Sequence, residues 1–339
     1  MMKEKVTSID VARRAGVSQS AVSRVFTPGA SASRKTIEKV RKAAEELGYR
    51  PNPIARAMIT GKSRIIGLVV AYLDNQFYPV AVDRLSRVLQ ERGYHILVFM
   101  VEQFQDDISQ IVQELLDYQV EGIVTASVGM SNDLTDLCEA AGIPVVMFNR
   151  AKDDPRLAAV TSDNVAGGRT VANFLVAGGH ERIAHIAGWQ GATTGRDRAI
   201  GFAEGLKDHG REAVAVIDGE YNRDTAATVT RELFGRADPP DAVFVGNDHM
   251  AFAVMDTLRF ELGLSVPGDV SVVGYDDVPI AGWPAYDLTT VRQPVNRMVR
   301  ETVDALFSRI EGGQEPRQIL IPGPLVIRGS ARKPKGFRT

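Results

Sequence analysis

Hydrophobic and polar positions follow two different patterns on either side of residue 62. Before it, Val11, Ala12 and Ala15 share one face of a short segment, and a second apolar stripe runs from Ile37 to Leu47. This helical spacing predicts a small all-helical unit. After residue 62, short apolar runs alternate with amphipathic stretches of helix length. That alternation predicts an α/β body with parallel sheets and helices on both faces.

The N-terminal unit has distinct signals for where its helices begin and end. Thr7 followed by Asp10 is similar to a capping box, which predicts the start of a helix. Gly16 suits the left-handed end of that helix, and Ser18 is a favoured cap for the next one. We expect Ile9 to fold back onto the apolar face. The segment therefore predicts a helix, a tight turn and a second helix, followed by a third helix over about 34–47.

The second short helix leaves small polar side chains and an arginine on its outer side. A helix-turn-helix pair can place this helix in the major groove of double-stranded DNA. Arginine bonds guanine, glutamine bonds adenine, and serine bonds bases or phosphates. The alternative is a plain three-helix bundle with a solvated polar face. The side chains of this unit predicted to contact DNA are Thr7, Ser18, Gln19, Ser20, Ser23 and Arg24.

Charge is unevenly distributed although the whole chain carries a net charge of only −2. Residues 1–62 contain 13 Lys or Arg and 5 Asp or Glu, so they carry a net charge of +8, whereas the remainder carries −10. A basic unit on an acidic body predicts a polyanionic partner for that unit.

The single cysteine, Cys138, excludes an intrachain disulfide and agrees with a reducing cytosol. Because the sequence shows neither a secretory signal nor a membrane-spanning apolar run, we expect a cytoplasmic, nucleoid-associated protein.

A short segment joins the N-terminal unit to the body. It begins with Pro51 and Pro53, ends near Gly61, and holds about two turns of helix-compatible residues. So short a helix is marginal by itself in water. We therefore expect it to form only when DNA or a partner copy stabilises it. A simple linker is the alternative interpretation.

At this point the chain resembles transcriptional regulators of the lactose-repressor (LacI/GalR) family, with a similarity that runs from Val6 to about Leu325. The most specific parts are Asp10-Val11-Ala12, Ala15-Gly16-Val17-Ser18, Val22-Ser23-Arg24-Val25 and Leu47-Gly48-Tyr49-Arg50-Pro51-Asn52-Pro53. The resemblance implies a homodimer or a higher oligomer that binds operator DNA as a repressor.

The resemblance also implies roles for particular residues that face DNA. Gln19, Ser20 and Arg24 stand at positions that read bases in the family. Asn52 and Met58 are the predicted contacts of the hinge, with Met58 at the place of a leucine wedged into the minor groove. Ala21 and Phe26 differ from the threonine and leucine usual at their positions, so the operator sequence does not carry over from relatives.

For the body, the resemblance implies the two-lobed fold of periplasmic sugar-binding proteins, in which the chain crosses between lobes three times. We expect a headpiece over 1–50, a hinge helix and linker over 51–62, and an effector-binding and dimerisation domain over 63–339. The first lobe is expected over about 63–162 and 293–324, and the second over about 163–292 and 325–339. The predicted strands are Ile65–Val70, Ile96–Met100, Gly122–Ala126, Pro144–Phe148, Ile183–Ala187, Ala242–Gly246 and Val270–Gly274.

Polar and aromatic residues follow several of these strands. Open α/β sheets bind ligands beyond the carboxyl ends of their strands. Carboxylate, amide and guanidinium groups beside aromatic rings suit a small polyhydroxylated effector, such as a sugar or a sugar derivative. The predicted effector-binding residues, most of which the family resemblance assigns, are Phe77, Tyr78, Asn149, Thr194, Arg198, Tyr221, Asn247 and Asp276.

Neighbouring residues bear on which effector is bound. Asn149 stands where many family members have aspartate. Ala192 stands where purine-binding members have arginine, which argues against a purine. The extra arginines Arg150 and Arg196 leave a sugar acid as an open alternative.

Two other classes of function remain as alternatives. The body alone would fit a transport-type sugar-binding protein, but residues 1–62 oppose that interpretation. An α/β enzyme acting on a sugar or nucleotide has little support, because the five histidines lack metal-type spacing and no serine has the flanking glycines of a nucleophile elbow. His185 lies in a predicted strand and is interpreted as a core residue. Gly61-Lys62-Ser63 is not a phosphate-binding loop, because Arg56 stands where that motif needs glycine. We therefore expect a non-enzyme without metal or cofactor.

Overall fold

The computed structural model describes residues 6–27, 30–51, 62–71, 73–101, 108–128, 130–152, 154, 156–313 and 318–335. It divides into two units, Met1–Ser63 and Arg64–Thr339, and each is considered separately. Asn52 and Met58, the two predicted DNA contacts in the hinge, lie outside the described residues. No helix among the described residues is both long and apolar enough to cross a membrane.

The first unit is a three-helix headpiece composed of α1 (Ser8–Ala15), α2 (Gln19–Phe26) and α3 (Arg34–Leu47). Val11, Val22 and Val40, one from each helix, are buried together in its core. The predicted capping box is present, since the Thr7 side chain accepts from the Asp10 backbone N–H and the Asp10 side chain accepts from the Thr7 backbone N–H. Both capping bonds satisfy groups that the first turn of a helix leaves unpaired.

The turn between α1 and α2 follows the predicted signals. Gly16 adopts φ 64° and ψ 42°, and the Ser18 side chain accepts from the backbone of Ala21. The expectation for Ile9 was wrong, because its side chain is 52% exposed. Ile9 precedes the fully buried Val11 by two residues, which is about 200° around a helix, so the two side chains point to opposite faces.

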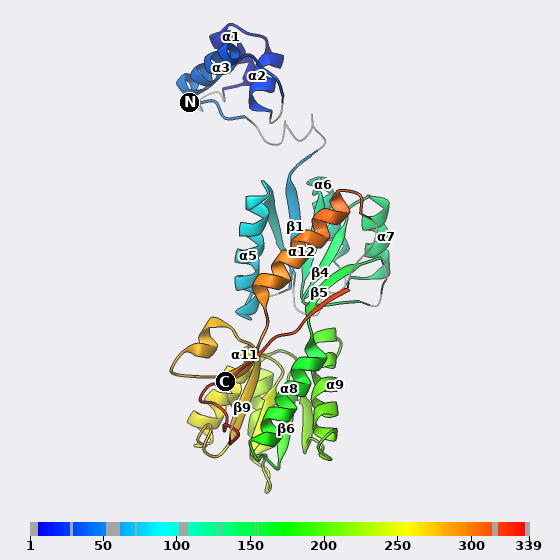
Figure 1. Ribbon diagram of the computed structural model, residues 1–339, viewed down its shortest axis with the longest axis vertical. Helices are drawn as coiled ribbons and strands as arrows, with labels where there is room; N and C mark the ends of the chain where they lie inside the picture. The colour runs from blue at the N-terminus through cyan, green and yellow to red at the C-terminus, as the bar shows by residue number, and fades with distance from the viewer. Residues whose placement is uncertain are drawn as a thin grey trace. The chain divides into compact units, whose positions relative to one another are not determined.

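The first sheet of the body has the strand order β11-β5-β4-β3-β1-β2, and its strands are parallel. Leu68 of β1 lies in a core with α5 and α12, whereas Val69 lies in a core with α6 and α7. Side chains that alternate along a strand thus give the sheet a helix layer on each face (Figure 1). The strands are β1 (Ile65–Val70), β2 (His95–Met100), β3 (Gly122–Ala126), β4 (Val145–Phe148), β5 (Ala158–Ser162) and β11 (Gln318–Ile321). The helices are α5 (Phe77–Glu91), α6 (Ser109–Asp117), α7 (Asn132–Ala140) and α12 (Val295–Ile310).

The second sheet has the order β12-β10-β9-β8-β6-β7, with β12 antiparallel to β10 and the other pairs parallel. Helices α8 and α9 cover one face, and α10 and α11 cover the other. The strands are β6 (Ile183–Ala187), β7 (Ala215–Asp218), β8 (Ala242–Val245), β9 (Ser271–Asp276), β10 (Thr289–Arg292) and β12 (Leu325–Val326). The helices are α8 (Asn164–Ala177), α9 (Thr193–Lys207), α10 (Arg223–Phe234), α11 (Asp248–Asp256), the π-helix η1 (Thr257–Glu261) and the 3-10 helix η2 (Pro279–Gly282).

The chain passes between the two sheets at three places (Figure 1). It leaves the first sheet after β5, returns after β10 through α12, and leaves again between β11 and β12. The predicted fold class, a helix-turn-helix headpiece with a two-lobed parallel α/β body, is confirmed. The predicted residue limits of the lobes stay a prediction. Three crossings leave the carboxyl ends of several strands from both lobes near the site described next.

Candidate functional site

A small polar pocket lies between the two lobes of the body, and we call it the effector pocket. Seven of the eight residues predicted to bind effector line it, together with three that were not in that prediction. Its cavity volume is about 10 Å³, which is about the space of one water. The lining residues are Asn75, Tyr78, Ser127, Asn149, Arg150, Thr194, Arg198, Tyr221, Asn247 and Asp276. Phe77, the eighth predicted residue, does not line the pocket and instead packs on Tyr78 and Phe148.

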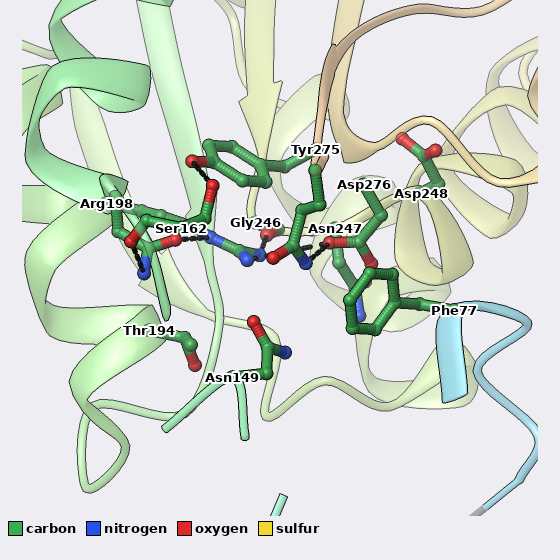
Figure 2. A network of polar contacts seen from close by, with 12 residues as sticks. Phe77, Asn149, Ser162, Thr194, Arg198, Gly246, Asn247, Asp248, Tyr275 and Asp276 are labelled. Atoms are coloured by element: carbon green, nitrogen blue, oxygen red, sulfur yellow. Dashed lines mark hydrogen bonds and ion pairs between the residues drawn. The ribbon is translucent and has the colours of Figure 1, made fainter. Parts of the chain in front are cut away.

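Arg198 is the most tightly held of these residues. Its Nε donates to Asn164 Oδ1 at 2.9 Å, and its Nη1 donates to the Gly246 carbonyl at 2.6 Å. Its guanidinium carbon lies 3.7 Å from the centre of the Tyr275 ring (Figure 2). Planar guanidinium groups suit this combination of directed bonds and stacking. Arg198 therefore presents a fixed cation to the pocket.

Close helix packing places Arg198. A Cβ on Gly168 of α8 would lie 2.3 Å from the Arg198 carbonyl oxygen, and one on Gly201 of α9 would lie 2.0 Å from the Val165 carbonyl oxygen. Only glycine permits this approach of α8 and α9. Asn164, at the start of α8, can then reach Arg198 and also donate to the Ser162 carbonyl at 3.0 Å.

Asp276, at the end of β9, links several parts of the body. Its Oδ1 lies 3.5 Å from Arg198 Nη2 and accepts from Gln293 Nε2 at 2.6 Å. Its Oδ2 accepts from Asn75 Nδ2 at 3.4 Å. Burial raises the pKa of Asp276, and the Arg198 charge and the hydrogen bonds from Gln293 and Asn75 oppose that rise. Because Asn75 follows β1 and Gln293 lies in a crossing segment, this carboxylate contacts both lobes and one of their connections.

Asp248, which begins α11, supports the segment that carries Asp276. Its Oδ1 accepts from the Thr290 hydroxyl at 2.6 Å and its Oδ2 accepts from the Val278 N–H at 3.0 Å. Burial first, and then the charge of Asp276, raise the pKa of Asp248 to about 7. The bonds from Thr290 and Val278 fix the loop after β9 at the floor of the pocket.

The other predicted residues occupy the walls. Asn149 has φ 65° and donates from Nδ2 to the Tyr78 hydroxyl at 3.2 Å. The Tyr221 hydroxyl donates to Thr194 Oγ1 at 3.2 Å. Asn247 caps α11, since its Oδ1 accepts from the Met250 N–H at 2.9 Å. Amide and hydroxyl groups in this arrangement offer both donors and acceptors to hydroxyls of a ligand.

In the headpiece, the described side chains predicted to contact DNA are all exposed. Gln19 donates from Nε2 to Ser8 Oγ at 3.0 Å, and Arg24 donates from Nε to the Ser20 carbonyl at 3.4 Å. The first bond joins the start of α2 to the start of α1, and the second lies within α2. The exposed face of α2 therefore carries polar groups suited to base edges.

Comparisons with known proteins agree with both units. The profile described as "Bacterial regulatory proteins, lacI family" matches residues 8–52, and "Periplasmic binding protein-like domain" matches residues 172–331. The HTH-type transcriptional regulator CelR of Thermobifida fusca is 34% identical over 94% of this chain and 96% of its own length. The chain belongs to the lacI family of bacterial regulatory proteins. The predicted family is thus confirmed.

Other members of the lacI family show the same relationship. The ribose operon repressor of Escherichia coli (strain K12) is 30% identical over 96% of this chain and 99% of its own length. A crystal structure of the lac repressor dimer bound to operator and the anti-inducer ONPF superposes with a TM-score of 0.87 at 29% identity, covering 96% of this chain and 99% of that one. A complex of CelR with cellobiose gives a TM-score of 0.73 at 32% identity, covering 96% and 100%.

The structure can also be compared with the predicted core position of His185 and with the spacing of possible metal ligands. His185 is a core residue as predicted, 1% exposed, with Nδ1 3.0 Å from the Phe244 carbonyl oxygen. Burial lowers its pKa to about 4. Within the described ranges, no group of three His, Cys, Asp or Glu side chains is arranged to hold a metal ion.

Three pocket residues and two supporting residues were missed by the prediction. Asn75 and Ser127 follow β1 and β3, where the rule that ligands lie beyond strand ends expects them, but neither was among the predicted binding residues. Arg150 follows Asn149 and was noted only as a neighbouring arginine. Asn164 and Gln293 act through Arg198 and Asp276 across the fold, and no local pattern in the sequence signals such contacts.

Proposed function

We propose that this lacI-family regulator is a homodimeric repressor that binds operator DNA through its headpieces. The observation that supports this proposal most directly is the exposed polar face of α2 in a capped helix-turn-helix unit of net charge +8. Gln19, Ser20 and Arg24 are the proposed base-reading residues. Thr7, Ser18 and Ser23 are the proposed phosphate or base contacts, and Asn52 and Met58 the proposed hinge contacts.

We further propose that a small polyhydroxylated effector controls the affinity for operator. The effector pocket supports this proposal, because every residue that lines it carries a polar side chain. Relatives point the same way, since one solved complex is that of CelR with cellobiose and one relative is a ribose operon repressor. A cavity of about 10 Å³ is too small for a sugar. Binding therefore requires the lobes or their side chains to rearrange.

Contacts between the lobes supply a route from effector to DNA. Asn75 of the first lobe donates to Asp276 of the second, and the Ala151 N–H of the first lobe donates to Thr193 Oγ1 of the second at 3.2 Å. An effector that engages Asp276 competes with or reinforces such contacts. It then favours one arrangement of the lobes, and a ligand can shift an equilibrium only through such a difference in affinity.

We also propose that the chain acts by binding and not by catalysis, in the compartment that holds the chromosome. The support is that its relatives are named as transcriptional regulators and repressors. The proposed units are a headpiece over 1–50, a hinge over 51–62 and an effector domain over 63–339, with the division of the structure near residue 63 as support.

A binding experiment with two proteins tests this proposal. The full chain should retard a fragment of its own promoter in a mobility-shift titration, and a chain that begins at residue 63 should not. The shortened chain should keep the same affinity for effector as the full chain. Retardation of the promoter by the shortened chain would contradict the assignment of DNA binding to the headpiece.

A further inference from the structure

The charges around the effector pocket do not balance. Three charged side chains line it, namely Arg150, Arg198 and Asp276. Arg198 and Asp276 pair with each other at 3.5 Å, with side-chain exposures of only 3% and 2%. Within the described part of the chain, no carboxylate lies at ion-pair distance from Arg150. Among the described residues, one positive charge at the pocket, that of Arg150, therefore has no counter-charge.

Two polar atoms of adjacent residues at the pocket also have no partner. Arg150 Nε is buried and makes no hydrogen bond, and the same holds for Asn149 Oδ1. The Arg150 guanidinium carbon instead lies 5.6 Å from the centre of the Trp189 ring, across the boundary between the lobes. A buried donor or acceptor without a partner costs on the order of 1–3 kcal/mol. A ligand that supplies an acceptor to Arg150 and a hydroxyl to Asn149 would remove both costs.

A second cavity begins where residues 149–152 leave the effector pocket, and we call it the outer chamber. Its cavity volume is about 330 Å³, a size typical of small-molecule sites. The two cavities are lined by residues adjacent in sequence, since Arg150 and Thr194 line the pocket while Ala151 and Thr193 line the chamber. The described residues that line it are Ala151, Lys152, Asp154, Thr193, Arg196, Asp197 and Gln318.

Among the described residues, two cations and two carboxylates line the outer chamber, so its own charges balance. Both of its carboxylates are in ion pairs: Asp197 pairs with Arg196 at 3.3 Å, and Asp154 pairs at 2.8 Å with Arg156, which also pairs with Asp136 and Glu139. Lys152, in contrast, donates to the neutral side-chain oxygen of Asn132 at 2.6 Å. The segment after β4 thus presents Arg150 and Lys152, two cations with no carboxylate of their own among the described residues.

We propose that the effector is an anionic sugar whose carboxylate or phosphate binds Arg150 at the boundary between the effector pocket and the outer chamber. This inference rests on the proposed control by a polyhydroxylated effector. The hydroxyls of the ligand contact Asn149, Arg198 and Asp276, while its anionic group faces Arg150 and the outer chamber. A guanidinium pairs with carboxylate or phosphate through directed, charge-assisted hydrogen bonds.

Tryptophan fluorescence of the full chain gives a direct test, because the sequence has only Trp189 and Trp283. Trp283 is 55% exposed, so Trp283→Phe leaves Trp189 as the single reporter beside Arg150. This variant is titrated with sets built on one sugar: D-glucose, D-gluconate, D-glucuronate and D-glucose 6-phosphate, and the same four forms of D-galactose. We expect at least one anion to bind about tenfold or more tightly than its neutral parent. Whether the tighter-binding compound carries a carboxylate or a phosphate shows which of the two anionic groups binds Arg150.

Variants of Arg150 connect that preference to the proposed contact. Arg150→Gln should reduce the preference for the anion to less than about threefold, and Arg150→Lys should keep part of it. Because no carboxylate in the described part of the chain pairs with Arg150, Arg150→Gln should unfold at the same temperature as the parent. The matched control is Arg231→Gln, which removes an arginine that pairs with Glu261 at 2.6 Å on the surface of the second lobe. This control should keep the preference.

The possible outcomes separate this inference from the proposed function. Equal or tighter binding of the neutral parents would overturn the anionic assignment and leave control by a sugar intact. Undiminished preference in Arg150→Gln would overturn the role of Arg150. If no compound of either set binds while the promoter is still retarded, both the anionic sugar and the polyhydroxylated effector are wrong.

Discussion

Arg198 and Asp276 form a buried ion pair in the wall of the effector pocket, with Nη2 and Oδ1 3.5 Å apart. Each also bonds neutral groups, Asn164 in the case of Arg198 and Gln293 in the case of Asp276. The pair is therefore electrically neutral as a unit but still has polar atoms that face the pocket. Sugar hydroxyls can bond such a pair without bringing a charge of their own into the protein interior.

Asp276→Asn should remove the response to effector and leave operator binding intact. The loss of the carboxylate weakens the bonds to effector hydroxyls and leaves Arg198 without a counter-charge, so we expect about a 100-fold or greater loss of effector affinity, in line with 2–5 kcal/mol for one partner of a buried charge pair. Calorimetric titration and promoter binding measure the two properties. Glu261→Gln, which breaks the exposed pair with Arg231, is the control and should change neither.

Gly168→Ala should weaken effector binding although residue 168 is not one of the residues that line the effector pocket. The added Cβ would lie 2.3 Å from the Arg198 carbonyl oxygen, so α9 must shift and move the guanidinium. We expect a destabilisation of about 1–3 kcal/mol and at least a tenfold loss of effector affinity. Gly282→Ala is a suitable control, because its Cβ would meet its nearest neighbour, Arg328, at an ordinary 3.7 Å. Equal affinities for the two variants would contradict the role assigned to the α8–α9 contact.

Substitutions on α2 should separate base reading from simple charge. Arg24→Ala should cost about 1–3 kcal/mol of operator affinity and relax the preference at one base pair. Lys42→Ala removes the same charge from the exposed surface of α3 and should cost far less. Fluorescence anisotropy with operator variants measures both. A uniform loss across all operator variants for Arg24→Ala would assign this arginine to phosphate instead of a base.

The buried His185 should make the body less stable in acid. Its pKa is lowered by burial to about 4, against about 6.5 for a solvated histidine. As the pH falls, the unfolded chain therefore takes up a proton before the folded one. The contribution of His185 to the free energy of unfolding is complete above pH 6.5 and is lost as the pH falls toward 4. Asp248, with its raised pKa of about 7, changes stability with pH in the opposite direction over about pH 4–7. The effect of His185 must therefore be measured as the difference in stability between the parent chain and a variant.

The difference between the parent chain and His185→Phe isolates the histidine. Denaturant unfolding at pH 7.5 and pH 5 should show a smaller acid-induced loss of stability for His185→Phe, by on the order of 1–2 kcal/mol over this range. Phenylalanine keeps an aromatic ring against Phe244, which stacks on His185 at 4.6 Å. An identical loss in both proteins would show that His185 does not titrate on unfolding in this range.

Local signals in the sequence predicted much of the fold. Helix caps such as Thr7 and Ser18 and apolar stripes such as Ile37–Leu47 depend on residues a few positions apart, and these predictions are confirmed. Strands β5, β7, β10, β11 and β12 were missed. β5 reads Ala-Ala-Val-Thr-Ser and β10 reads Thr-Thr-Val-Arg, and neither is a distinct apolar run. They are strands because neighbouring strands pair with them, which is a tertiary effect.

The residues of the candidate site were also predicted only in part from the sequence. Positions after strand ends, helped by the family resemblance, identified seven residues that the fold brings together. The position after the first strand placed Phe77 with them, but this side chain packs in the apolar space beside Phe148. Asn164 and Gln293 depend on contacts between segments far apart in the chain. Such contacts leave no periodic signal, so only the assembled structure reveals them.

The most direct test of the whole account is promoter binding by the full chain, measured by fluorescence anisotropy at several salt concentrations with and without the bound sugar. The account predicts binding that weakens by about a thousandfold or more between 50 and 200 mM salt, because many Lys and Arg side chains meet phosphates. It also predicts a shift of operator affinity by the sugar, which Asp276→Asn abolishes. No binding to promoter DNA at low salt, with or without any sugar of the panel, would contradict it.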